Sequence, residues 1–300
     1  MISMIFILFF SFFISYIMFY PSLMLSNMLG AIDIPNERKI HTKPIARGGG
    51  WTFFTAFLFL LIFLPIKNDL KIALLVSGGV IFLVGFLDDA INLSPFSKLS
   101  GQFLALSVYI FTSELLNYKI SIIQGVFSSI WIIFITNSTN FIDGVDGLAT
   151  GVSSSQALCL AVMSFLLNKL DIFLCSALIL GATLGFLPRN FPKAKIFMGD
   201  CGSLFLGFVL SVLSSRLIFE SKSILCTIAS ILVFRIPIYD ASFSIIKRLI
   251  KRKNPFKADK EHFHHQLLKY GFSKECTTLF LVTLSLFFGF WGILILTLGI

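Results

Sequence analysis

Charged side chains are scarce in this chain of 300 residues. Asp, Glu, Lys and Arg together make up 13% of it, about half of the ~25% that is usual for a soluble domain. Hydrophobic residues make up 56%, and the mean hydropathy is +0.91. This composition excludes a soluble domain and a nucleic-acid partner, and it indicates an integral membrane protein.

Two further patterns are missing from the sequence. Strand-like alternation of polar and apolar residues is absent, so we expect helices to cross the membrane. The 5 cysteines have no metal or redox spacing, and we interpret them as small core residues. The expected fold is an all-α integral membrane protein with a single polytopic domain over residues 1–300.

Apolar runs of about membrane length are abundant. No Lys or Arg precedes Arg38, so we expect the first run to stay in the protein as a helix rather than act as a cleaved signal peptide. We expect about ten transmembrane helices, near residues 2–29, 51–66, 71–87, 99–113, 120–136, 148–167, 171–187, 204–219, 223–239 and 277–299.

The polar breaks between these runs alternate between long and short. The long breaks hold all 4 histidines and most of the 24 Lys and Arg residues. The positive-inside rule therefore places the long breaks in the cytoplasm, as active-site loops, and both chain ends outside. The long breaks are 30–50, 88–98, 137–147, 188–203 and 240–276.

One long break, NSTNFIDGVDG at residues 137–147, repeats polar side chains every three residues. In a helical turn such residues form one polar line, and carboxylate and amide oxygens suit Mg²⁺, with Mn²⁺ as a second choice. The glycines would let a ligand approach the backbone. An Asx-rich loop without a ligand is the structural alternative. The residues concerned are Asn137, Asn140, Asp143, Gly144, Asp146 and Gly147.

Two other acidic motifs lie at span ends. Asp88 and Asp89 close an apolar run, where they oppose the helix dipole, so we expect a role in cation binding or proton transfer unless they are solvated charges. Asp200 lies in MGDCGS before the next run, where it suits a phosphate and metal pair or an N-cap.

The last long break joins a basic amphipathic stretch, SIIKRLIKRK, to a histidine cluster. We expect the amphipathic stretch to lie as a helix on anionic membrane lipids. For His262, His264 and His265 we favour hydrogen bonding to phosphate groups over a zinc site, because the usual cysteine or carboxylate ligands are missing at matching spacing.

Five segments, in this order, resemble the polyprenyl-phosphate N-acetylhexosamine-1-phosphate transferases of glycosyltransferase family 4. The histidine segment is more similar to the branch that initiates O-antigen and teichoic-type glycans than to the phospho-MurNAc-pentapeptide translocases. The segments are DIPNERKIHTKPIARGGG, GFLDDA, NSTNFIDGVDGL, FMGDCGSLFLG and DKEHFHHQLLKYG.

The resemblance implies a reaction and a location. Such an enzyme transfers an N-acetylhexosamine-1-phosphate from a UDP-sugar to undecaprenyl phosphate, releases UMP, and so starts a cell-surface polysaccharide such as lipopolysaccharide. It is Mg²⁺-dependent and works at the cytoplasmic face of the bacterial inner membrane. A homodimer is compatible with this reading.

The resemblance also implies roles for single residues. Asp200 would be a metal ligand assisted by Asn140, and Asp88 and Asp89 would position or deprotonate the lipid phosphate. The remaining matched residues would contact the substrates: Arg47, Asn137, Asp143, Gly144, Asp146, Gly147, His262, His264 and His265.

The main alternative from another class is an ion-coupled transporter. That reading predicts discontinuous helices at mid-membrane and charges at span centres, whereas the acidic residues of this chain lie at span ends. A phosphatase acting on exported lipid would need its histidines on the outer face, and a scaffold would not need a line of metal-type ligands.

Overall fold

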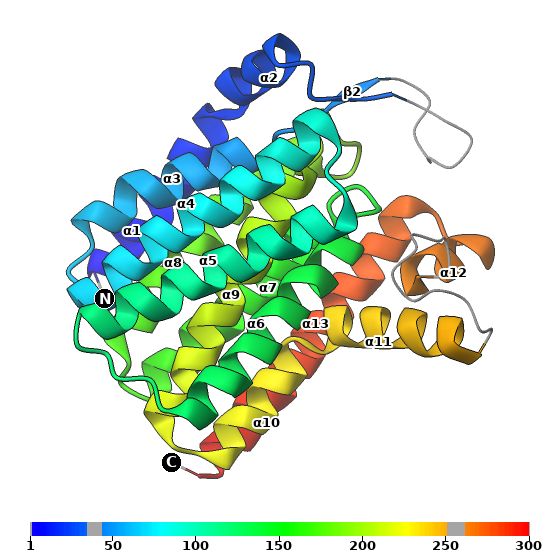
Figure 1. Ribbon diagram of the computed structural model, residues 1–300. Helices are drawn as coiled ribbons and strands as arrows, with labels where there is room; N and C mark the ends of the chain where they lie inside the picture. Colours follow the sequence, from blue (N-terminus) through cyan, green and yellow to red (C-terminus); the bar gives the residue numbers. More distant parts are fainter. Residues whose placement is uncertain (1, 35–43, 251–261, 300) are drawn as a thin grey trace.

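The computed structural model describes residues 2–34, 44–250 and 262–299 as 13 helices and a two-stranded antiparallel hairpin. The helices lie side by side, and the ends that carry α12 and the hairpin are opposite the beginning of α1 and the end of α13 (Figure 1). The elements are α1 (Ile2–Ile17), α2 (Phe19–Met28), β1 (Ile32–Asp33), β2 (Ile45–Ala46), α3 (Gly50–Phe63), α4 (Asn68–Ile91), α5 (Pro95–Leu115), α6 (Ile122–Phe141), α7 (Leu148–Leu166), α8 (Leu170–Asn190), α9 (Gly199–Ser221), α10 (Ile224–Val233), α11 (Arg235–Ile250), α12 (Phe263–Lys269) and α13 (Lys274–Thr297).

The all-α membrane fold is confirmed, but the count of ten spans is not. Each predicted span coincides with a helix or a helix pair. Among the described residues, 7 helices are long and apolar enough to cross a membrane, or 8 if the bent pair α10 and α11 is one span. The remaining two predicted spans correspond to α3, which has only 14 residues, and to α5, which begins with the polar sequence PFSKLSGQ.

Helix α9 is the centre of the bundle. It packs against α3, α4, α6, α7, α8 and α10, and nearly all of its residues are buried. An apolar helix that is buried all round needs no polar face, which explains why its sequence is apolar in every direction. The long central helix therefore carries its first residues, including Asp200, to one end of the bundle.

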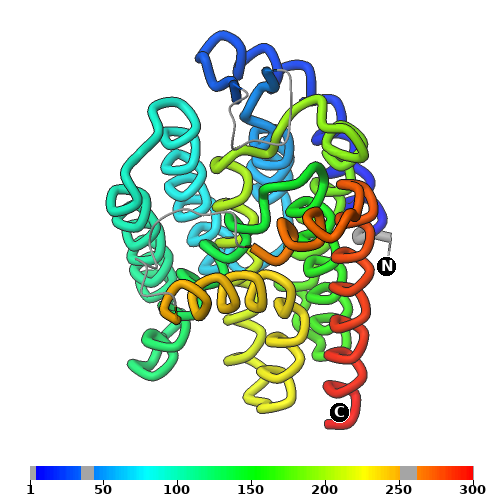
Figure 2. Tube along the Cα trace, turned by 90° about the vertical axis from the view of Figure 1, so that its right-hand side faces the viewer, coloured from blue at the N-terminus to red at the C-terminus, as the bar shows by residue number. Residues whose placement is uncertain are grey.

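Helix α11 leaves the bundle. It bends by 72° from α10 and runs across the other helices (Figures 1 and 2). Ile246, Leu249 and Ile250 are exposed on it, whereas Arg248 is buried. An apolar face turned away from the protein fits the interfacial helix predicted for this stretch, although its last residues, 251–253, lie outside the described part of the chain.

The close approach of α4 and α9 depends on Gly85. A Cβ atom at this position would lie 2.4 Å from the carbonyl oxygen of Asp200 and 2.5 Å from Cα of Cys201. Both are backbone atoms, so neither can move without moving α9. Gly85 thus sets the separation between the end of α4 and the start of α9.

We expect Gly85→Ala to destabilise the protein by ~1–3 kcal/mol, because the added methyl group overpacks a helix contact. Thermal unfolding in detergent measures this effect. Gly79→Ala on the same helix is the matched control, because a Cβ atom there meets nothing within 4 Å. Equal losses in both variants would show that the α4–α9 contact is not the cause.

Candidate active site

Three of the predicted segments meet at one end of the bundle. The C-terminal ends of α4 and α6 and the N-terminal end of α9 bring Asp88, Asn140 and Asp200 together. The Asn140 amide donates to Asp200 Oδ1 at 3.0 Å and to Ser203 Oγ at 2.8 Å. These three residues come from long breaks that we placed on the same side of the membrane, and the structure brings them together.

Lys98 of α5 connects these carboxylates. Its Nζ lies 2.7 Å from Asp88 Oδ2 and also contacts Asp200 Oδ2. The other oxygen of Asp88 accepts a hydrogen bond from the backbone N–H of Leu93 at 2.8 Å. We call Asp88, Lys98, Asn140 and Asp200 the carboxylate cluster.

Asp89 faces a different partner from its neighbour. Its two carboxylate oxygens accept hydrogen bonds from the backbone N–H groups of Asp200 and Cys201, each at 2.9 Å. These N–H groups belong to the first turn of α9, where a helix has no internal acceptors for them. Asp89 thus caps α9 from another helix, and Asp88 is the member of the pair that faces the cluster.

The predicted polar line is interrupted after Asn140, because α6 ends at Phe141. Asn137 is engaged with Gln102 of α5 through two amide hydrogen bonds, of 2.6 and 3.1 Å. It also donates to the carbonyl oxygen of Ile133. Asn137 therefore holds α5 against α6, and its side chain does not join the cluster.

The loop after α6 carries the other two aspartates. Asp143 is half-buried near Asp200 and Asp89, and burial, reinforced by these two carboxylates, raises its pKa to about 8. Asp146 accepts a hydrogen bond from the N–H of Ala194 at 3.4 Å, and its own carbonyl accepts one from Thr278. Asp146 thus ties the loop to its surroundings.

The glycines of this loop approach protein side chains. A Cβ atom on Gly144 would lie 2.7 Å from Nε2 of His264, and one on Gly147 would lie 2.6 Å from Cβ of Phe191. Gly147 also has a φ of 74°, which favours glycine. Both glycines face side chains of the protein itself, and the ligand approach that we predicted stays a prediction.

Arg47 follows β2 and lies beside the α9 loop. Its Nη2 is 2.7 Å from Asp33 Oδ1, and its backbone pairs with that of Phe197. Its positive charge favours the ionised form of Asp143, so it lies within electrostatic reach of the site. Arg38, Lys39 and His41 belong to the same break, at residues 30–50, and lie outside the described residues.

The histidine segment packs on the loop after α6, at residues 142–147, and Asp240 of α11 holds it there. His262 Nδ1 is 2.7 Å from Asp240 Oδ2, and the N–H of Phe263 donates to Oδ1 at 2.7 Å. His264 is buried with Nδ1 3.6 Å from Asp240 Oδ1, and the ring centroid of His265 lies 4.4 Å from that of His264. Asp240 therefore holds the histidines against the loop that carries Asp143 and Gly144.

The donor set of the carboxylate cluster fits Mg²⁺. Mg²⁺ is usually bound by one or two carboxylates together with substrate phosphates, and Asp88 and Asp200 already converge on the Lys98 ammonium. Within the described ranges no group of three or more His, Cys, Asp or Glu side chains could hold a metal alone. As placed, Asn140 donates to Asp200, so it orients that carboxylate rather than offering its oxygen as a ligand.

Three residues with site contacts had no role in our sequence analysis. Lys98 has only one signal, a lone positive charge shortly after the Asp88–Asp89 pair. Asp240 is an isolated acid in the apolar run RIPIYDASF, and such a residue in a membrane protein is by default a functional candidate. Gln102 has no signal, because its pairing with Asn137 is a tertiary contact.

The sequence is similar to a known protein family and to several named proteins. Residues 71–218 match the model described as glycosyl transferase family 4, a segment that runs from α4 into α9 and includes Asp88 to Asp200. The chain is 33% identical over 279 residues to a probable undecaprenyl-phosphate N-acetylglucosaminyl 1-phosphate transferase of Bacillus subtilis. The aligned segment covers 89% of this chain and 78% of the relative.

Two further relatives have similar identity and coverage. An undecaprenyl-phosphate alpha-N-acetylglucosaminyl 1-phosphate transferase of Thermotoga maritima is 34% identical over 266 residues, covering 87% of this chain and 81% of the relative. A phospho-N-acetylmuramoyl-pentapeptide-transferase of Staphylococcus epidermidis is 30% identical over 264 residues, covering 79% and 81%.

The raised pKa of Asp143 leads to a stability prediction. The unfolded carboxyl titrates near 3.8 and the folded one near 8, so the folded protein loses stability as the pH rises from about 4 to about 8. We expect Asp143→Asn to raise the unfolding midpoint in EDTA-containing detergent buffer by about 2–4 °C at pH 8, or ~1 kcal/mol, and by less at pH 5. A gain that does not depend on pH would contradict this origin.

Proposed function

The chain belongs to glycosyl transferase family 4, and we propose that it transfers N-acetylhexosamine-1-phosphate from a UDP-sugar to undecaprenyl phosphate. The observation that carries the proposal is the meeting of Asp88, Asn140 and Asp200 at one end of a membrane-spanning bundle. A water-soluble nucleotide sugar and a lipid phosphate can both reach such a position. The names of the relatives favour N-acetylglucosamine as the sugar.

In the proposed reaction, an oxygen of the undecaprenyl phosphate attacks the β-phosphorus of the UDP-sugar. The bond between the β-phosphorus and the bridging oxygen breaks, and UMP leaves with that oxygen and its electron pair. The products are undecaprenyl-diphospho-sugar and UMP. A phosphate monoester is already anionic near neutral pH, so the main task of the protein is to bring two anions together in line.

The cationic and polar side chains of the site suit this task. Mg²⁺ bound by Asp88 and Asp200 would neutralise charge on the diphosphate and on the leaving UMP. Lys98 lies between these two carboxylates and can offset the charge of an incoming phosphate. Arg47 and the histidines stand around the Asp143 loop, where they would hold the nucleotide sugar.

The proposed setting is the cytoplasmic side of the bacterial inner membrane. The positive-inside rule supports this orientation, since the loops at the site end are rich in Lys and Arg. The product would be the first lipid-linked intermediate of a cell-surface polysaccharide.

The carboxylate cluster provides the direct test. We expect Asp200→Asn to lower the exchange of labelled UMP into the UDP-sugar by about 10²–10³-fold, because it removes a carboxylate that would hold the Mg²⁺ against the diphosphate. Asp171→Asn, in the first turn of α8 at the other end of the bundle, is the control and should retain exchange. Asp200→Asn protein that inserts normally and remains fully active would refute the assignment.

The link between Asp240 and the histidines gives a second test. In Asp240→Asn the amide oxygen can still accept the hydrogen bond from the Phe263 N–H. The amide N–H groups then face His262, so the side chain at 240 donates to His262 instead of accepting from it. We expect the KM for the UDP-sugar to rise by about tenfold, or ~1.4 kcal/mol, with a smaller change in kcat. Asp240→Glu should restore part of the loss, whereas a fall in kcat at unchanged KM would argue against a binding role.

A further inference from the structure

A second polar site lies at the end of the bundle opposite to the carboxylate cluster. Arg216 is on α9, sixteen residues after Asp200, and is therefore about 24 Å away along the helix at ~1.5 Å per residue. This distance approaches the ~30 Å thickness of a hydrocarbon core. If one end of the bundle meets one membrane surface, Arg216 lies near the other.

The guanidinium of Arg216 is almost completely engaged. Its Nε donates to Glu220 Oε1 at 2.8 Å, its Nη2 contacts Asp69 Oδ2, and the ring of Tyr118 covers it at 3.8 Å. The side chain is only 1% exposed. Its Nη1 is buried and has no hydrogen-bond partner among the described residues. A buried donor without an acceptor costs ~1–3 kcal/mol, and more when the group is charged, so the site lacks an acceptor.

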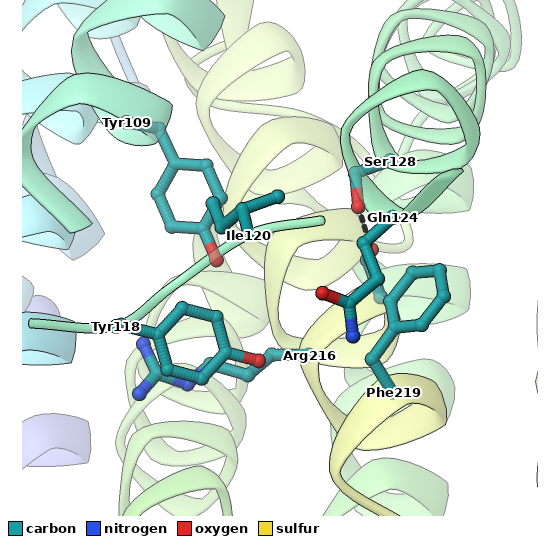
Figure 3. A pocket seen from close by; sticks show the side chains of 8 residues that line it. Tyr109, Tyr118, Ile120, Gln124, Ser128, Arg216 and Phe219 are labelled. Atoms are coloured by element: carbon teal, nitrogen blue, oxygen red, sulfur yellow. Dashed lines mark hydrogen bonds between the residues drawn. The ribbon is translucent and has the colours of Figure 1, made fainter. Parts of the chain in front are cut away.

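The pocket beside Arg216 presents further donors. Tyr118 and Gln124 point their polar ends into the same space, with Tyr109 above them (Figure 3). Gln124 Oε1 already accepts from the N–H of Ser121 at 3.0 Å, which leaves its Nε2 as a donor. A ligand that satisfies this pocket must therefore supply acceptor oxygens.

The surroundings of the pocket indicate where such oxygens come from. Ile122 and Ile123, at the start of α6, are 86% and 79% exposed. Exposure of large apolar side chains to water costs free energy, whereas their contact with acyl chains is favourable. These two residues lie between Ile120 and Gln124, which line the pocket, so we infer that its mouth faces the boundary between lipid headgroups and acyl chains.

The charged residues around Arg216 argue against selection of a ligand by charge alone. Arg216 and Lys169 face Asp69 and Glu220, so two positive and two negative groups balance each other. A site of this kind recognises a hydrogen-bond acceptor attached to an apolar tail. It does not need an anionic headgroup, and it gives little attraction to a free dianion.

We propose that this pocket binds the phosphate group of a membrane phospholipid, with Arg216 Nη1, Gln124 Nε2 and the Tyr118 hydroxyl as donors to its oxygens. The phosphodiester sits at the mouth, and its acyl chains lie on Ile122 and Ile123. This site is independent of the proposed transferase activity, because it involves other residues at the other end of the bundle.

The test uses Gln124→Glu in the full-length protein. Glu is as good as Gln at the third position of the capping box that Ser121 begins, so the start of α6 is preserved. The substitution replaces the donor with a negatively charged acceptor. Asn168→Asp is the matched control, since it adds the same charge at the same end of the bundle but at an exposed position outside the pocket.

Native mass spectrometry and thermal unfolding of the delipidated protein in detergent then measure binding of four probes: dioleoyl phosphatidylglycerol, dioleoyl phosphatidylethanolamine, dioleoylglycerol and inorganic phosphate. We expect the wild type and Asn168→Asp to retain one phospholipid molecule, with either headgroup. Gln124→Glu should bind that phospholipid at least tenfold more weakly. Tyr118→Phe, which keeps the ring over Arg216, should weaken the same lipid by several fold.

Three results would overturn the proposal. Unchanged phospholipid retention in both Gln124→Glu and Tyr118→Phe would show that the pocket is not the site. Equal retention of dioleoylglycerol would show that apolar contact alone is responsible. Displacement of the phospholipid by inorganic phosphate at similar concentration would assign the pocket to free phosphate.

Discussion

The architecture of the candidate active site depends on one carboxylate that supports a neighbouring helix. Asp89 accepts hydrogen bonds from two N–H groups in the first turn of α9, those of Asp200 and Cys201, and Gly85, one turn earlier on α4, lets the two backbones touch. Without an acceptor, those N–H groups would be orphaned in an apolar bundle, at a cost of ~1–3 kcal/mol each. The same two contacts fix where Asp200 lies relative to Asp88. The geometry of the carboxylate cluster therefore depends on the capping of α9 by Asp89.

The bilayer imposes the second constraint, which is that ionisable groups collect at the ends of the helices. Asp69, in the first turn of α4, and Arg216, near the end of α9, share one end, whereas Asp88, Lys98 and Asp200 share the other. This distribution disagrees with the transporter alternative, which predicts charges at span centres. The two ends differ in access, since the Arg216 side chain is 1% exposed and the Asp200 side chain is 25% exposed. The buried end with Arg216 suits a fixed hydrogen-bond network, and the more exposed end with Asp200 suits substrates that bind and dissociate.

The sequence predicts the fold class, the helix positions and the meeting of Asp88, Asn140 and Asp200, because hydropathy fixes the spans and the alternation of long and short breaks fixes which ends lie together. It does not predict how adjacent residues divide their roles. Asp88 and Asp89 are consecutive, yet one faces Lys98 and the other faces a backbone. Asn137 and Asn140 share a helix, yet one pairs with Gln102 and the other with Asp200. These outcomes depend on which partner helix each side chain meets, and spacing within a single helix carries no such information.

Charge at the carboxylate cluster links the fold to the proposed reaction. When all three side chains are ionised, Asp88, Asp200 and Lys98 together carry a net charge of −1, which opposes the approach of a nucleotide diphosphate. The raised pKa of Asp143, about 8, keeps this nearby carboxyl largely uncharged at neutral pH and so limits the repulsion. A divalent cation would change the sign of the cluster. For the function proposed here, Asp88 and Asp200 would hold the metal ion that offsets the charge of the nucleotide sugar, and the side chains of the loop at 142–147 would face the bound nucleotide sugar.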